Sequence, residues 1–198
     1  MLIGVSFIAA MLVWSKGRTL IVDRYTKRFP SFTEAIPQIE AQVAARVPGT
    51  SVFLASSLDH MPPSLMRLVE RGRALHQNII LLTVVHSDTE AVIAESSRVD
   101  MSELSHGFHR AVVRCGFMEQ PSVHAILNRA AAERGVRFVD AEVTYFLGRE
   151  TILATSKSRM SRFAESMFSY LQRNAVAADR NFGIPPQQIV EIGMQVVL

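Results

Sequence analysis

Compact apolar runs, separated by polar turns, define the order of elements in the central part of the chain. Residues 51–56 (SVFLAS) form an apolar run of strand length, and residues 78–86 (NIILLTVVH) form a second run that is almost entirely apolar and β-branched. A continuous run of this kind is typical of a strand that is covered on both faces of its sheet. Between them, Pro62 and Pro63 predict the start of a helix that ends at Gly72. This order predicts a right-handed βαβ unit.

The pattern continues with shorter and more polar elements. One helical stripe follows Pro121 and ends at Gly135, and the strongest stripe in the chain covers residues 160–178. The other predicted strands are 98–104, 108–117, 136–139, the two arms of a hairpin at 142–146 and 150–154, and 188–198. The expected fold class is therefore α/β, with a mixed, mainly parallel sheet flanked by helices.

The first fourteen residues (MLIGVSFIAAMLVW) contain twelve hydrophobic residues and no charge. A secretory signal peptide would carry its basic residues before such a run, whereas here they follow it. A buried core element is the second interpretation, and the end of a transmembrane helix with Trp14 at the interface is the third, which we favour. Residues 1–15 would then end a membrane helix, 16–48 would be a basic juxtamembrane segment with a connector helix starting near Ser31, and 49–198 would form a cytoplasmic α/β domain.

The charge of the chain is concentrated beside this apolar run. The net charge is +3, but residues 15–28 hold five basic residues and one acidic residue, so the remainder is close to neutral. A nucleic-acid-binding domain would spread its basic excess over a folded face, so we expect no nucleic-acid partner. Basic residues beside an apolar segment instead follow the positive-inside rule, which predicts a plasma (inner) membrane protein with the residues after 15 in the cytoplasm. A composition of 48% hydrophobic and 20% charged residues excludes intrinsic disorder.

The usual motifs for catalysis are missing from the sequence. There is no glycine-rich phosphate loop, no nucleophile elbow and no Cys-x-x-Cys pair. His106 and His109 are the closest pair of histidines, and their position at a turn between strands is more typical of solvated side chains than of zinc ligands. We therefore expect no enzymatic activity, no cofactor and no metal site.

Polar residues follow both strands of the predicted βαβ unit. Ser56, Ser57 and Asp59 come after the first strand, and His86 and Ser87 end the second. Ligands of open α/β sheets bind beyond the carboxyl ends of the strands, so these five residues are candidates for the rim of a ligand site. The alternative is that they are turn and capping residues.

The predicted hairpin carries two adjacent opposite charges at its tip. Arg149 and Glu150 follow the apolar side chains of Tyr145 and Phe146. Apolar flanks favour a buried or interfacial ion pair, and the alternative is an exposed turn. These four residues are therefore the candidate interface of the domain.

Six segments follow one another along the chain in a characteristic order. They are WSKGR (14–18), RVPGTSVFL (46–54), NIILLTV (78–84), RCGFME (114–119), YFLGRE (145–150) and GIPP (183–186). Together they resemble the C-terminal cytoplasmic tail of the Kup family of potassium uptake transporters. The resemblance spans essentially the whole chain, and Cys115 departs from the aromatic residue that is usual before Gly-Phe-Met-Glu.

The resemblance implies a segment of a membrane protein that imports potassium together with protons. The ion path and the coupling carboxylates would lie in the membrane core, outside this chain, so this segment would not bind the transported potassium. Its partners would be that membrane core and a second copy in a homodimer, and its role would be regulatory, dimerising or stabilising. The alternative from the residues alone is a soluble nucleotide-binding or stress-response α/β module, for which the βαβ unit is the support.

Overall fold

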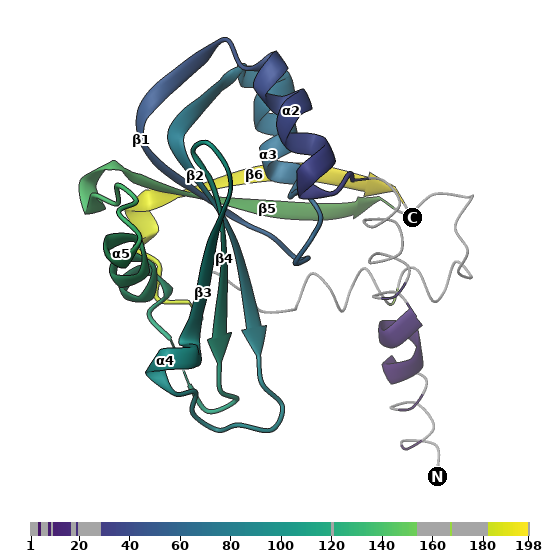
Figure 1. Cartoon of the computed structure of the whole chain (residues 1–198). Helices are drawn as coiled ribbons and strands as arrows, with labels where there is room; N and C mark the ends of the chain where they lie inside the picture. The colour runs from purple at the N-terminus through teal and green to yellow at the C-terminus, as the bar shows by residue number, and fades with distance from the viewer. Residues whose placement is uncertain are drawn as a thin grey trace. The chain divides into compact units, whose positions relative to one another are not determined.

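The computed structural model describes residues 29–119, 121–153 and 182–197, together with positions 4, 8, 10–16, 19 and 167. The chain divides into two compact units. The larger unit comprises Pro30–Gly148 and Ala177–Ile192, and the smaller comprises Met1–Phe29, Arg149–Val176 and Gly193–Leu198. Most of the sheet and the helices that cover it belong to the larger unit (Figure 1).

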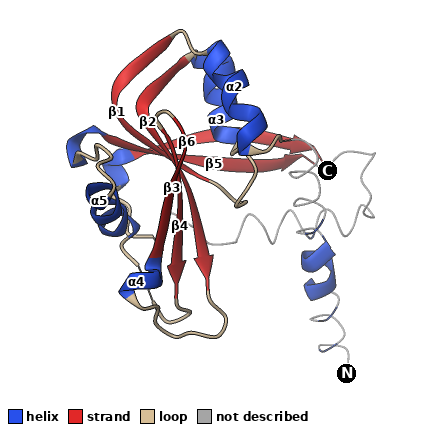
Figure 2. Ribbon diagram, viewed as in Figure 1, coloured by secondary structure: helices blue, strands red, loops and turns tan. Residues whose placement is uncertain are grey.

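Six strands form one mixed sheet in the order β3-β4-β2-β1-β5-β6 (Figures 1 and 2). The strands are β1 (Ala45–Leu54), β2 (Ala74–His86), β3 (Val99–Ser105), β4 (Phe108–Cys115), β5 (Val143–Leu153) and β6 (Ile189–Val197). Strand β1 is parallel to β2 and β5, β2 is parallel to β4, and β3 is antiparallel to β4. The predicted α/β fold with a mainly parallel sheet is confirmed.

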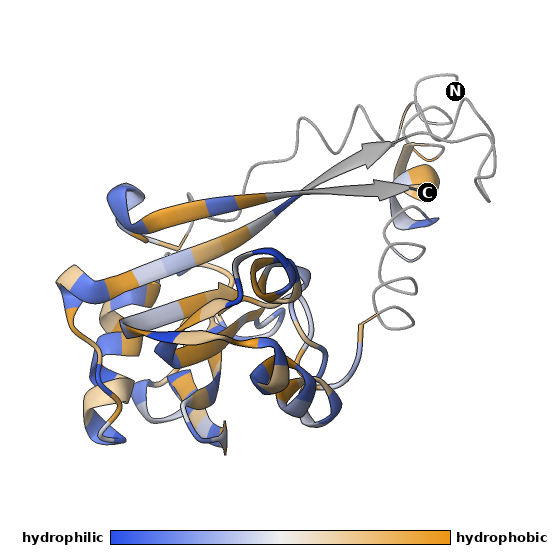
Figure 3. Cartoon of the chain, turned by 90° about the horizontal axis from the view of Figure 1, so that it is seen from above, coloured by the Kyte–Doolittle hydropathy of each residue, from blue (hydrophilic) through white to orange (hydrophobic). Residues whose placement is uncertain are grey.

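Helices cover both faces of the sheet, and successive strand residues alternate between two cores. Val52 and Tyr145 pack in the core beside α5, whereas Phe53 and Phe146 pack in the core beside α2 and α3. The helices are α2 (Phe32–Gln42), α3 (Pro63–Gly72), α4 (Glu95–Arg98) and α5 (Val123–Glu133), with short 3-10 turns η1 (Asp140–Glu142) and η3 (Pro186–Gln188). The helices carry both hydrophilic and hydrophobic colours in Figure 3, as amphipathic helices do.

The central strand β2 shows why its sequence is almost continuously apolar. Ile79, Ile80, Leu81 and Leu82 are all fully buried, two in each core. A strand with helices on both faces has no solvent-facing side, so every position needs an apolar side chain. The predicted two-sided coverage of this strand is confirmed.

Helix α2 is part of the larger unit and not a separate connector. It begins after Ser31, as predicted, and the Glu34 carboxylate accepts a hydrogen bond from the Ser31 N–H at 3.4 Å. Phe32, Ala35 and Ile39 are buried in the core that also contains Phe53. The compact unit begins at Pro30, because the apolar stripe of α2 is buried against the sheet. The domain boundary at residue 49 stays a prediction.

The Pro48-Gly49 pair lies inside strand β1 and does not separate two segments. The pairing of β1 with β2 shifts register between Val47 and Thr50, which marks a bulge. Gly49 has φ +111°, and a Cβ there would lie 2.8 Å from the backbone oxygen of Glu142. A glycine is needed at this position because the strand bends where another backbone comes close.

The hairpin predicted around Leu147-Gly148-Arg149 is wrong, because β5 runs without interruption from Val143 to Leu153. Strand β5 lies between β1 and β6 in the sheet, and its pairing with β1 runs from Val143 to Phe146. Residues 136–139 form no strand, contrary to prediction. The predicted helix at 160–178 lies outside the described residues, apart from position 167.

The predicted membrane-helix end at residues 1–15 lies partly outside the described residues. Among the positions described there, Ile8, Met11 and Leu12 are each more than half exposed. In the described part of the chain, no helix has both the length and the apolar character that crossing a membrane requires. The boundary at residue 15 stays a prediction.

Candidate functional site at the carboxyl ends of β2 and β4

The five residues predicted to rim a ligand site fall into two separate loops. The last pairing of β1 joins Leu54 to Leu82, and β2 then continues for four residues to His86. At the usual rise of ~3.3 Å per residue, the end of β2 lies about 13 Å beyond this pairing. Ser56, Ser57 and Asp59 are therefore displaced along the sheet from His86 and Ser87.

Most of the predicted rim residues are engaged in local structure. The Ser57 hydroxyl lies 3.2 Å from His60 Nδ1 and accepts the N–H of Asp59 at 3.3 Å. The Ser87 hydroxyl accepts the N–H groups of Thr89 and Glu90 at 3.3 and 3.1 Å. These contacts are those of turn residues, and they favour the turn interpretation over the ligand interpretation. The His86 ring stacks at 6.3 Å from that of Phe182, and Ser56 is exposed.

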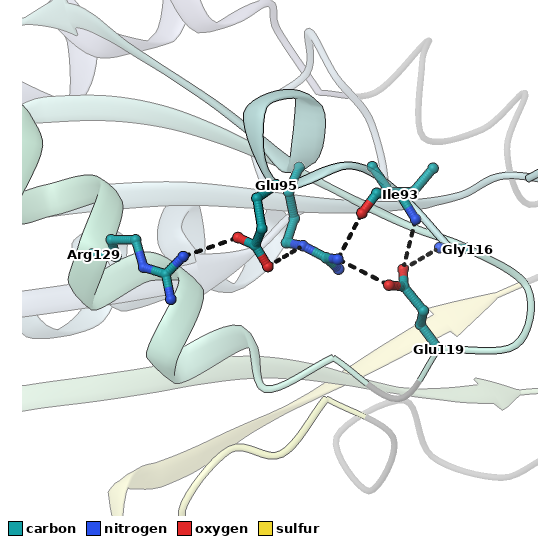
Figure 4. Close-up of polar contacts among 6 residues, drawn as sticks. Ile93, Glu95, Gly116, Glu119 and Arg129 are labelled. Atoms are coloured by element: carbon teal, nitrogen blue, oxygen red, sulfur yellow. Dashed lines mark hydrogen bonds and ion pairs between the residues drawn. The ribbon is translucent and has the colours of Figure 1, made fainter. Parts of the chain in front are cut away.

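A carboxylate that no sequence argument singled out organises the loops beyond β2 and β4. Glu119 accepts hydrogen bonds from Gly116 N at 2.7 Å, from Ile93 N at 3.3 Å and from Arg98 Nη2 at 2.9 Å (Figure 4). Arg98 also donates to the Ile93 carbonyl at 2.7 Å. The Glu119–Arg98 clamp thus joins the segment before α4 to the turn after β4.

Burial and pairing set the electrostatics of the clamp. The side chains of Arg98 and Glu119 are only 11% and 14% exposed. The hydrogen bond from Arg98, followed by that from the Gly116 N–H, lowers the pKa of Glu119 from an ordinary 4.5 to about 2. The same hydrogen bond raises the pKa of Arg98. Glu95 extends the network, with Arg98 Nε at 3.1 Å and Arg129 of α5 at 2.9 Å.

Gly116 allows the two loops to approach at backbone distance. A Cβ at this position would lie 2.1 Å from the carbonyl oxygen of Ala91. Phe117 N donates to the Glu90 carbonyl at 3.1 Å, and Met118 N donates to the Ala91 carbonyl at 3.3 Å. The motif Gly-Phe-Met-Glu therefore has a structural meaning, although its spacing gave no reason to pair Glu119 with Arg98.

We expect Glu119→Gln to remove a pH-dependent part of the stability. Because folding lowers the pKa of Glu119, ionised Glu119 stabilises the fold above about pH 4.5, and this contribution is lost as the pH falls through about 2. The urea midpoint of Glu119→Gln should be lower than that of the wild type at pH 7, with the difference shrinking between pH 4.5 and 2. Glu133→Gln, at an exposed position of α5, is the control. A difference that stays constant over this range would contradict the role of the clamp.

Two of the four candidate interface residues lie inside the cores. The Tyr145 hydroxyl lies 2.8 Å from His124 Nδ1 of α5, and burial raises the pKa of this phenol, so it stays neutral. The Phe146 ring stacks on Phe53 with 4.7 Å between centroids. Both rings hold the domain together and are not available to a partner. The Arg149 side chain is already engaged in an interaction, and the Glu150 side chain lies outside the described part of the chain. An interface through this charged pair therefore stays a prediction.

In the described residues, no group of three or more His, Cys, Asp or Glu side chains is arranged to hold a metal ion.

Comparison with known families is decisive for the identity of the chain. Residues 48–198 match the family described as K+ potassium transporter C-terminal domain. The chain belongs to this family. The match favours the transporter interpretation over a soluble nucleotide-binding or stress-response module.

Individual relatives extend the similarity beyond the family's boundaries. A probable potassium transport system protein Kup 1 of Syntrophobacter fumaroxidans is 37% identical over 194 residues, which cover 98% of this chain and 29% of that protein. Its counterpart from a Bradyrhizobium strain is 38% identical, covering 94% of this chain and 30% of that protein. The Kup protein of Myxococcus xanthus is 32% identical over the full chain, again 30% of its own length. The chain thus spans about 30% of the length of these curated relatives, and no solved structure matches it.

Proposed function

We propose that this chain is the C-terminal cytoplasmic part of a potassium importer and that it regulates or stabilises transport by the membrane part. The observation that carries the proposal is the match of residues 48–198 to a potassium transporter C-terminal domain. The relatives are named as potassium transport proteins, and the greater part of their length lies outside this chain. In this proposal, the ion path and the proton coupling belong to that other part.

A domain of this kind acts on transport through differential contacts. A domain outside the ion path changes the rate only if its contacts differ in free energy between transporter conformations, or if it keeps the transporter folded. The test is potassium uptake by the full transporter with and without residues 30–198, in cells that lack other importers. An unchanged uptake rate together with an unchanged amount of transporter in the membrane would contradict the proposal.

The cytoplasmic location is a separate prediction, based on the charge pattern. Residues 15–28 carry five basic residues and one acidic residue directly after an apolar run, which the positive-inside rule places in the cytoplasm. A fluorescent protein fused after Leu198 of the full transporter should fluoresce, and alkaline phosphatase fused at the same position should be inactive. The reverse pair of results would place the domain outside the cell.

A further inference from the structure

The loops beyond β2 and β4 hold three large apolar side chains in solvent. Val92, Phe117 and Met118 are 67%, 59% and 75% exposed, and we refer to them as the apolar patch. They are neighbours because the hydrogen bonds from Phe117 N and Met118 N to the 90–91 carbonyls hold the two loops together. Isolated exposed apolar residues are common, whereas apolar residues clustered on paired loops mark interaction sites.

The patch is held in place by the Glu119–Arg98 clamp, whose two side chains are mostly buried. Glu119 binds the N–H groups of Gly116 and Ile93, which flank the patch in sequence, and Arg98 binds both Glu119 and the Ile93 carbonyl. Ile93 itself is buried, so it anchors the loop that carries Val92. A surface fixed in this way loses little conformational entropy on binding, which favours association.

The rim of the patch is acidic. Asp88 and Glu90 are exposed on the segment that leads towards α4. Glu95 is paired with Arg98 and with Arg129 of α5, so these three side chains add no unpaired negative charge to the rim. Arg114 is the exposed basic residue nearest to Phe117 in sequence. An acidic rim around an apolar centre is complementary to a surface with basic and apolar side chains.

Building on the proposed function, we propose that the apolar patch docks on a basic cytoplasmic surface of the membrane part of the same transporter. Cytoplasmic loops of membrane proteins carry an excess of Lys and Arg, which complements the acidic rim. A symmetric contact between two copies would bring two acidic rims together, because a two-fold interface uses the same surface twice. Charge repulsion therefore favours the membrane part over a second copy as the occupant.

Replacing the patch should lower transport without unfolding the domain. Phe117→Ser combined with Met118→Ser removes two exposed side chains, so the fold is expected to be retained. We expect initial potassium uptake per transporter in the membrane to fall roughly fivefold or more, the lower end of typical coupling between sites. Asp88→Lys with Glu90→Lys should also lower uptake, because it reverses the charge of the rim.

The matched control is Val139→Ser. Val139 is 41% exposed and precedes the amino end of β5. Strands β5, β1, β2 and β4 are parallel, so Val139 lies near the amino ends of the strands, whereas the patch lies beyond their carboxyl ends. Uptake of this variant should equal that of the wild type. Unchanged uptake in the Phe117→Ser/Met118→Ser transporter would overturn the docking surface. If removal of residues 30–198 still lowers uptake in that case, the proposed function stands; if it does not, both proposals fail.

Crosslinking identifies the occupant directly. Replacing Met118 by p-benzoylphenylalanine in the full transporter should yield a photoproduct within one chain, mapped by mass spectrometry to a basic cytoplasmic loop of the membrane part. Coexpression of two differently tagged copies separates this product from a link between copies. Crosslinks only between copies, only to other proteins, or to nothing would each overturn the proposal.

Discussion

Removal of residues 30–198 from the full transporter is expected to lower potassium uptake by about fivefold or more, or to lower the amount of transporter in the membrane. The potassium-over-sodium preference of the remaining uptake should not change. Selectivity comes from the groups that coordinate the ion along its path. The chain matches the C-terminal domain of the family, which the proposed function places outside that path. Rubidium or potassium uptake, normalised to transporter in the membrane, measures both quantities.

The structure determines where this truncation should begin. A cut at residue 49 would divide β1 and leave the apolar face of α2, with Phe32, Ile36 and Ile39, without the sheet that buries it. Such an exposed face promotes aggregation and would lower abundance for an unrelated reason. A cut at Pro30 follows the boundary of the compact unit. An altered ion preference in this truncated form would place the domain in the permeation path and refute the proposed function.

Gly116→Ala is expected to destabilise the isolated chain by about 3 kcal/mol, the upper end of the range for overpacking. The new methyl group would lie 2.1 Å from the Ala91 oxygen and 2.4 Å from its carbonyl carbon. These are backbone atoms, so relief requires the two loops to separate, which also breaks the hydrogen bonds that the N–H groups of Phe117 and Met118 donate to the carbonyls of Glu90 and Ala91. Thermal unfolding should show a melting temperature lower by roughly 6–12 °C for a chain of this size.

Gly72→Ala serves as the matched control for this substitution. Its Cβ would meet only Leu68 Cδ1, at 3.7 Å, which is an ordinary van der Waals contact. Gly72 is the last residue of α3, where alanine favours the helix, so the variant should be as stable as the wild type or slightly more stable. Equal melting temperatures for Gly116→Ala and the wild type would mean that the loops separate at little cost, and that the patch is not held rigidly.

The hydrophobic pattern alone determined the class of fold and most of its elements. The run at 78–86 has no polar alternation, so only a strand covered on both faces suits it, and Ile79–Leu82 are buried in two cores. Helix α3 was predictable from proline at its start and glycine at its end. The family was also contained in the sequence, because six ordered segments resemble it and the family match covers residues 48–198.

The tertiary structure decided the features that depend on residues far apart in the chain. Leu147-Gly148-Arg149 has the local character of a turn, but it lies within strand β5, which has a place between β1 and β6 in the sheet. Pro48-Gly49 resembles a boundary, yet it forms a bulge because the sheet continues past it. The Glu119–Arg98 clamp joins residues 21 positions apart, and no local periodicity connects them. Local patterns report which face of an element is apolar, whereas contacts between distant segments depend on how those faces pack, and packing is decided only when the whole sheet has formed.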